Sequence, residues 1–197
     1  MNLGKISNVY NMGPMMKSAV HGTHDKSLVV LHETVSSDIV GWSDVMSVAH
    51  YLDQKDYGMH GIVDKEGHIA WAYGLGEAIF YHAASGEGRV NTRGIGIELV
   101  SRVMLTAPDN TSRWKIWWER NAQINATAKL LAWVTRVHGI PLQYSRPDVP
   151  GVTTHWHVTR HYNVYGGHVD CWPRHLGGYF PALRIIERAK YYRGLGY

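Results

Sequence analysis

An uninterrupted aliphatic run at residues 28–31, followed directly by His32, constrains the fold of this chain more than any other feature. A strand that is apolar at every position is typical of the centre of a sheet whose two faces are both covered by helices. The strand carries an imidazole at its C-terminal end, and further histidines, a carboxylate and a thiol follow within residues 154–157 and 168–171. Such residues commonly assemble a catalytic zinc site. The sequence therefore predicts a covered sheet with a metal site at the end of one strand.

Strands and helices alternate along the rest of the chain. Apolar runs that flank a Lys-Glu-Gly turn, and one further run, predict strands at 60–64, 68–71 and 93–100. Apolar residues at helical spacing predict helices at 43–52, 114–137 and 181–191. Residues 1–26 lack clear periodicity and are expected to form an irregular lead-in to one domain at 27–197. Strands interleaved with helices indicate an α/β or α+β domain.

Composition and charge limit the possible partners. The net charge is +4, and the lysines and arginines are scattered along the chain. No basic stripe or nucleic-acid-binding motif is visible, so nucleic acid is not an expected partner, whereas a mildly anionic one such as bacterial cell wall fits. The first residues resemble neither a secretory signal nor a membrane span, so we expect cytoplasmic synthesis without membrane insertion. Cys171 is the single cysteine, which excludes an internal disulfide and leaves a thiol for a metal.

Six short motifs follow one another in this order: Val-Val-Leu-His-Glu-Thr, Tyr-Gly-Met-His-Gly-Ile-Val-Asp-Lys-Glu-Gly-His-Ile, His-Ala-Ala, Gly-Ile-Gly-Ile-Glu-Leu-Val, Val-Thr-Thr-His and Asp-Cys-Trp-Pro. Together they resemble the type-2 N-acetylmuramoyl-L-alanine amidases, a family that includes the peptidoglycan recognition proteins and several phage endolysins. The resemblance covers residues 28–186. It implies an α/β domain with a central mixed β-sheet flanked by helices. It also implies a Zn²⁺ hydrolase that cuts the amide between N-acetylmuramic acid and L-alanine in peptidoglycan.

The resemblance places the zinc ligands on His32, His155 and a third residue, either Cys171 or Asp170. Three such ligands leave the fourth tetrahedral position of zinc open for water. The family's third ligand directly precedes Pro-Gly, whereas here a tryptophan separates Cys171 from the proline. We prefer Cys171 because it needs one insertion and because thiolates bind zinc well. Asp170 remains the alternative third ligand. With Asp170 as the ligand, His168 lies two residues before it, where many members carry a lysine that can stabilise the oxyanion.

Two further residues are implied in catalysis. Glu98 stands in the Ile-Gly-Ile-Glu-Leu motif, where the resemblance implies a general base for the attacking water; a structural ion-pair partner is the alternative. Tyr57 could replace the tyrosine that other members carry beside the histidine of the second strand. We expect His60 and His82 to line the cleft and to contact sugar or peptide.

These inferences predict a monomeric phage endolysin that binds and cuts peptidoglycan after release through a holin-type partner. A bacterial enzyme that trims imported wall fragments and a virion tail component are the other enzymatic interpretations. A recognition module that binds peptidoglycan without cutting it is the alternative from a different class, because family members that lose the third ligand have this role. The recognition module differs from the enzymatic interpretations in whether Cys171 or Asp170 reaches a metal held by His32 and His155.

Overall fold

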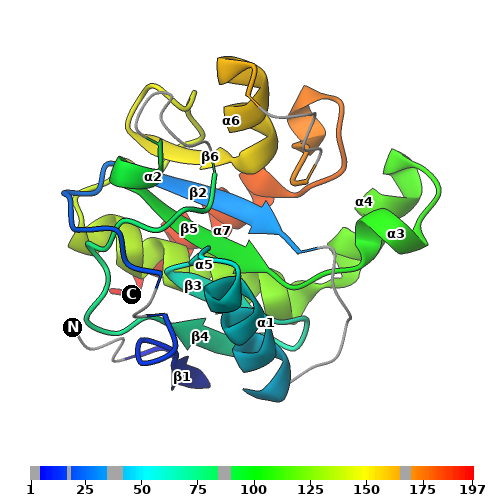
Figure 1. Cartoon of the computed structure of the whole chain (residues 1–197). Coiled ribbons are helices and arrows are strands. Elements are labelled where there is room, and N and C mark those ends of the chain that lie inside the picture. Colours follow the sequence, from blue (N-terminus) through cyan, green and yellow to red (C-terminus); the bar gives the residue numbers. More distant parts are fainter. Residues whose placement is uncertain (1–4, 17–18, 35–41, 84–89, 165–169) are drawn as a thin grey trace.

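The computed structural model describes residues 5–16, 19–34, 42–83, 90–164 and 170–197, and a six-stranded sheet lies at its centre (Figure 1). The strands are β1 (Val9–Asn11), β2 (Leu28–Glu33), β3 (Gly61–Val63), β4 (Ile69–Trp71), β5 (Gly94–Leu99) and β6 (Gly151–Thr154). Their order across the sheet is β1-β4-β3-β5-β2-β6. The β3–β4 hairpin is antiparallel and the other neighbouring strands pair in parallel. The sheet is therefore mixed, as predicted.

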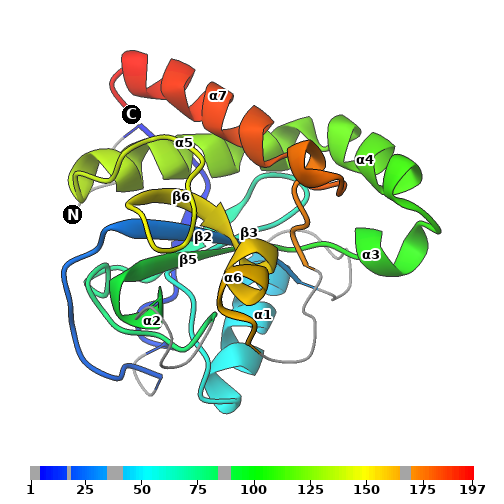
Figure 2. The ribbon, with the colours of Figure 1, turned by 90° about the horizontal axis from the view of Figure 1, so that it is seen from above.

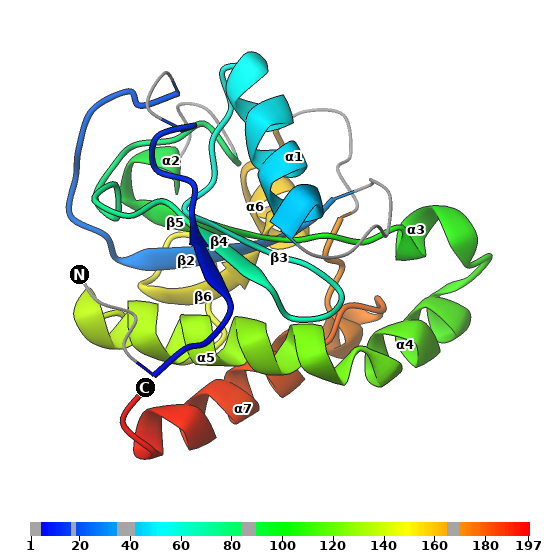
Figure 3. The same ribbon diagram turned by 90° about the horizontal axis from the view of Figure 1, so that it is seen from below.

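Helices cover both faces of this sheet. They are α1 (Trp42–Gln54), α2 (Val90–Arg93), α3 (Val103–Thr106), α4 (Asn110–Glu119), α5 (Asn121–Val137), α6 (His155–Tyr162) and α7 (Ala182–Gly194), with the 3-10 turn η2 (Arg174–Leu176). Figures 2 and 3 show α5 and α7 side by side on one face and α1 and α6 on the other. This layering confirms the predicted α/β domain. In the part of the chain that the structure describes, no helix is long and apolar enough to span a membrane.

Strand β2 is an interior strand between β5 and β6, and all six of its residues are buried. Val29 and Leu31 belong to the main core, to which α5 and α7 also contribute. Leu28 and Val30 pack on the opposite face with residues of α2 and α6. Each buried side chain of this size contributes about 1.5–3 kcal/mol to stability. The prediction that both faces of this strand are covered is confirmed.

Two sequence predictions of local structure were wrong. The segment predicted as one helix at 114–137 forms two helices, because Arg120 leaves the helical conformation at φ −75° and ψ 52°. Its buried guanidinium donates to the carbonyl of Val100, just after β5, at 3.3 Å. Residues 1–26 were expected to be irregular, yet Val9–Asn11 forms β1 beside β4. The domain boundary at residue 27 stays a prediction.

Candidate metal centre

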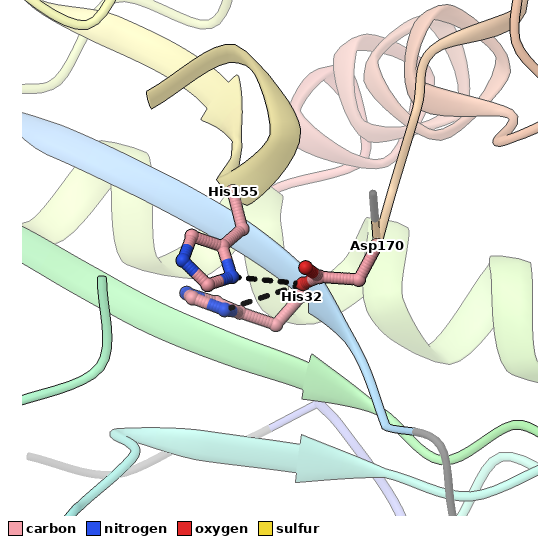
Figure 4. A group of neighbouring side chains, drawn as sticks. All are labelled: His32, His155 and Asp170. Atoms are coloured by element: carbon pink, nitrogen blue, oxygen red, sulfur yellow. Dashed lines mark hydrogen bonds and ion pairs between the residues drawn. The ribbon is translucent and has the colours of Figure 1, made fainter. Parts of the chain in front are cut away.

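Three side chains with metal-binding atoms converge at the C-terminal end of β2 (Figure 4). His32 comes from β2, His155 is the first residue of α6, and Asp170 comes from the segment that leads to η2. One ligand atom from each lies within 4.8 Å of the others. The Oδ2 atom of Asp170 is 2.9 Å from Nδ1 of His155 and 3.9 Å from Nδ1 of His32. The two histidine ring centroids are 4.7 Å apart.

The local structure explains why these residues meet. Strands β2 and β6 are parallel with Leu31 opposite Thr154, so the residues that follow these two, His32 and His155, reach the same edge of the sheet. Thr154 is extended and its hydroxyl caps α6, which turns the chain into a helix at His155. The backbone N–H of Trp156 then donates to the carbonyl of Asp170 at 3.1 Å and fixes the third segment against the helix.

The donor set fits a catalytic zinc ion. Two imidazole nitrogens and one carboxylate oxygen are among the ligands that zinc binds when a fourth position is left for water. Tetrahedral zinc with bonds of about 2.0–2.1 Å places neighbouring ligand atoms about 3.4 Å apart. The 2.9 Å and 3.9 Å separations from the Asp170 oxygen lie on either side of this value. Small side-chain movements would therefore bring all three atoms to the ion.

Cys171, the third ligand that we preferred, does not join this group among the residues that the structure describes. The group found in the described part of the chain contains Asp170, and Cys171 is completely buried in the main core. Burial, followed by the negative charges of Asp170, Glu33 and Glu98, raises the pKa of the thiol well above its usual value. Cys171 also has a φ of 60°, so the backbone turns sharply between the two consecutive residues. The geometry favours Asp170, the alternative that the position of His168 had supported.

Glu98 lies beside His32. The two residues are register partners in the parallel pair β2–β5, so their side chains share one face of the sheet. Glu98 is buried, and burial, followed by the charges of Asp170 and Glu33, raises the pKa of its carboxyl well above the usual value. A buried carboxyl of raised pKa next to a candidate metal centre is suited to proton transfer near neutral pH.

The other two predicted catalytic residues are not placed at the centre. The Tyr57 side chain is 54% exposed, and no contact in the described part of the chain joins it to His32, His155 or Asp170. His168 lies outside the described residues. The roles of Tyr57 and His168 therefore stay predictions.

His60 and His82 do not line an open cleft as expected, because both are buried. His60 accepts from the backbone N–H of Gly96 at 3.0 Å, and its Nε2 lies 2.9 Å from the carbonyl of Ala78. The Nδ1 atom of His82 lies 3.1 Å from Nε2 of His32. Burial, and then the charge of Lys26, lowers the pKa of His82 to about 3, so its ring is neutral.

Sequence reasoning also missed Glu33, which lies on the opposite face of β2 from His32. Its buried carboxylate accepts from the hydroxyl of Tyr179 at 2.7 Å and from that of Ser101 at 2.8 Å. The backbone N–H of Tyr179 in turn donates to the carbonyl of Trp172 at 2.8 Å. Glu33 thus ties the segment that carries Asp170 to β2. The apolar pattern gave no sign of this role, since Glu33 simply follows the histidine.

Several solved structures share the fold. Hydrolase AmiA of Staphylococcus aureus matches with TM-score 0.56 and 20% identity, over 89% of this chain and 77% of that one. The amidase endolysin LysCS of Clostridium intestinale matches with TM-score 0.53 and 15% identity over 85% of each chain, and the PlyG catalytic domain with 0.62 and 14% over 94% of each. None of the curated proteins matches the sequence. Residues 22–173 match the N-acetylmuramoyl-L-alanine amidase family, so the chain belongs to that family.

Proposed function

We propose that this peptidoglycan amidase is a zinc enzyme whose ligands are His32, His155 and Asp170. The convergence of their ligand atoms within 4.8 Å at the end of β2 is the observation that carries the proposal. Family membership supplies the reaction, hydrolysis of the amide between N-acetylmuramic acid and L-alanine. Bound zinc would polarise the scissile carbonyl and make a water molecule acidic enough to attack at neutral pH.

The residues of the chain then perform the proton transfers. Glu98 accepts a proton from the attacking water on its carboxylate and delivers it to the departing nitrogen of L-alanine. The raised pKa of Glu98 helps the second transfer, because a carboxyl that holds its proton can still donate it at neutral pH. His168 is proposed to donate to the oxyanion that forms on the scissile carbonyl, and Tyr57 to orient the attacking water or that oxyanion.

We further propose that the protein acts as a monomeric phage endolysin. LysCS, whose fold this chain shares, is itself described as an endolysin. The net charge of +4 favours adsorption to an anionic wall. In this proposal the protein is made in the cytoplasm and reaches the wall through a holin-type partner.

Metal content and amine release test the proposal together. Wild type should hold about one zinc per chain, as a mononuclear catalytic site requires, and should release amino termini from purified peptidoglycan. Asp170→Ala should lose both, whereas Cys171→Ser should keep its zinc. Asp148→Ala, at an exposed carboxylate that pairs with Arg146, is the matched control and should behave as wild type. A wild-type protein that binds the wall but holds no zinc and releases no amine would refute the proposal and favour the recognition module.

A further inference from the structure

The two ring nitrogens of His32 face different neighbours. Nδ1 faces the Asp170 carboxylate, 3.9 Å away, and Nε2 lies 3.1 Å from Nδ1 of His82. Both histidines are buried, and their rings meet nearly edge to face at 84°. We propose that His82 is a positioning residue, which fixes the tautomer and ring orientation of His32 and so sets the affinity of the site for zinc. The inference rests on the zinc site proposed above.

The chemistry of a ligand histidine requires a defined tautomer. The nitrogen that binds a metal must carry no proton, so the proton of a neutral ring moves to the other nitrogen. If Nδ1 of His32 binds zinc, Nε2 carries the proton and donates it to Nδ1 of His82, which must then be a bare acceptor. Partners of this kind orient the ligand ring and make it more basic. His82 therefore selects the His32 tautomer that can bind the ion.

The chain holds His82 in place from two sides. The side-chain oxygen of Asn91 accepts from the backbone N–H of His82 at 3.1 Å and from that of Ala83 at 2.8 Å. The imidazole lies against Gly94 and Gly96 of β5. A Cβ at Gly96 would be 2.9 Å from Cγ of His82, and one at Gly94 would be 3.4 Å from its Nε2. A side chain at Gly96 would occupy the space that the ring needs.

His60 provides a matched comparison. Like His82 it is buried, and the two ring centroids are 6.1 Å apart. Its nitrogens, however, contact the backbone of Gly96 and Ala78, on β5 and on the loop after β4. We therefore assign His60 to holding the fold together and His82 to orienting the metal ligand.

Zinc competition against a chromogenic chelator, with purified full-length protein, separates these roles. His82→Phe keeps the ring volume without an acceptor, and should weaken zinc binding by about 10- to 100-fold. His82→Asn places a side-chain oxygen where Nδ1 was and should restore most of the affinity. His60→Phe should lower the melting temperature of the zinc-free protein and leave its zinc affinity close to that of wild type.

The tautomer can be read in the wild-type protein, without any substitution, from the ¹⁵N shifts of the histidine rings. With zinc bound, Nε2 of His32 should carry a proton and Nδ1 of His82 should carry none. A proton on Nδ1 of His82, or unchanged zinc affinity in His82→Phe, would overturn the inference alone. A wild-type protein that binds no zinc would overturn the proposed metal site and this inference with it.

Discussion

The substitution Gly96→Ala tests whether β5 must lack a side chain beneath His82. The added Cβ would lie 2.9 Å from Cγ of His82 and 2.7 Å from Sδ of Met59. Carbon atoms in contact prefer a separation of about 3.5–4.0 Å, so the imidazole must move by about 0.6–1.1 Å. The Met59 side chain is flexible and can move aside, whereas His82 cannot move so far and keep its 3.1 Å contact with His32.

We expect Gly96→Ala to lower the free energy of unfolding by about 1–3 kcal/mol, the usual cost of an extra methyl group in a packed core. Urea unfolding of the zinc-free protein measures this loss, and chelator competition should show weaker zinc binding in the same variant. The matched control is Gly194→Ala in α7, where an added Cβ meets nothing within 4 Å. The control should change the free energy of unfolding by less than about 0.5 kcal/mol, because Gly194 is the last residue of α7 and substitutions at such surface positions have small effects. Full stability and full zinc affinity in Gly96→Ala would refute the packing argument.

Three further predictions concern the buried polar groups. Glu98→Gln should keep its zinc, and its rate of amine release should fall by about 100- to 10,000-fold. A fully active variant would exclude Glu98 as the general base. Tyr179→Phe should lose about 1–3 kcal/mol in urea unfolding, because the Glu33 carboxylate loses a donor, and unchanged stability would show that this hydrogen bond is dispensable. Burial lowers the pKa of Lys26 from 10.5 to about 8, so the unfolded chain binds more protons between these values and stability rises with pH. We therefore compare the free energies of unfolding of wild type and Lys26→Met. Their difference, wild type minus variant, should increase by about 2 kcal/mol from pH 7 to pH 9.5. A difference that does not change with pH would contradict the lowered pKa of Lys26.

The sequence predicted those parts of the molecule that local pattern determines. The aliphatic run at 28–31 was sufficient to identify a central strand, because only a sheet covered on both sides buries every position. The apolar runs around the Lys-Glu-Gly turn likewise predicted the β3–β4 hairpin. The break at Arg120 was missed, because it goes with a hydrogen bond from its guanidinium to the carbonyl of Val100, which is distant in the sequence.

The choice between Asp170 and Cys171 was beyond local pattern for a related reason. Both residue types bind zinc, and the two are adjacent, so composition alone cannot separate them. The positive φ of Cys171 and the hydrogen bond from Trp156 to the carbonyl of Asp170 decide which side chain faces the histidines. The role that we propose for His82 likewise depends on a contact between residues that are 50 positions apart.

The three candidate ligands come from two strand ends and a late loop, far apart in the chain. An unfolded chain would hold them at no fixed separation, so zinc would bind the folded protein much more tightly than the unfolded one. Folding and metal loading are then linked: free zinc at 100 times its dissociation constant would add about 2.7 kcal/mol to the stability of the fold. The resistance of such an enzyme to heat and proteolysis would depend on the zinc concentration around it, and a chelator would weaken the whole domain as well as stopping the reaction.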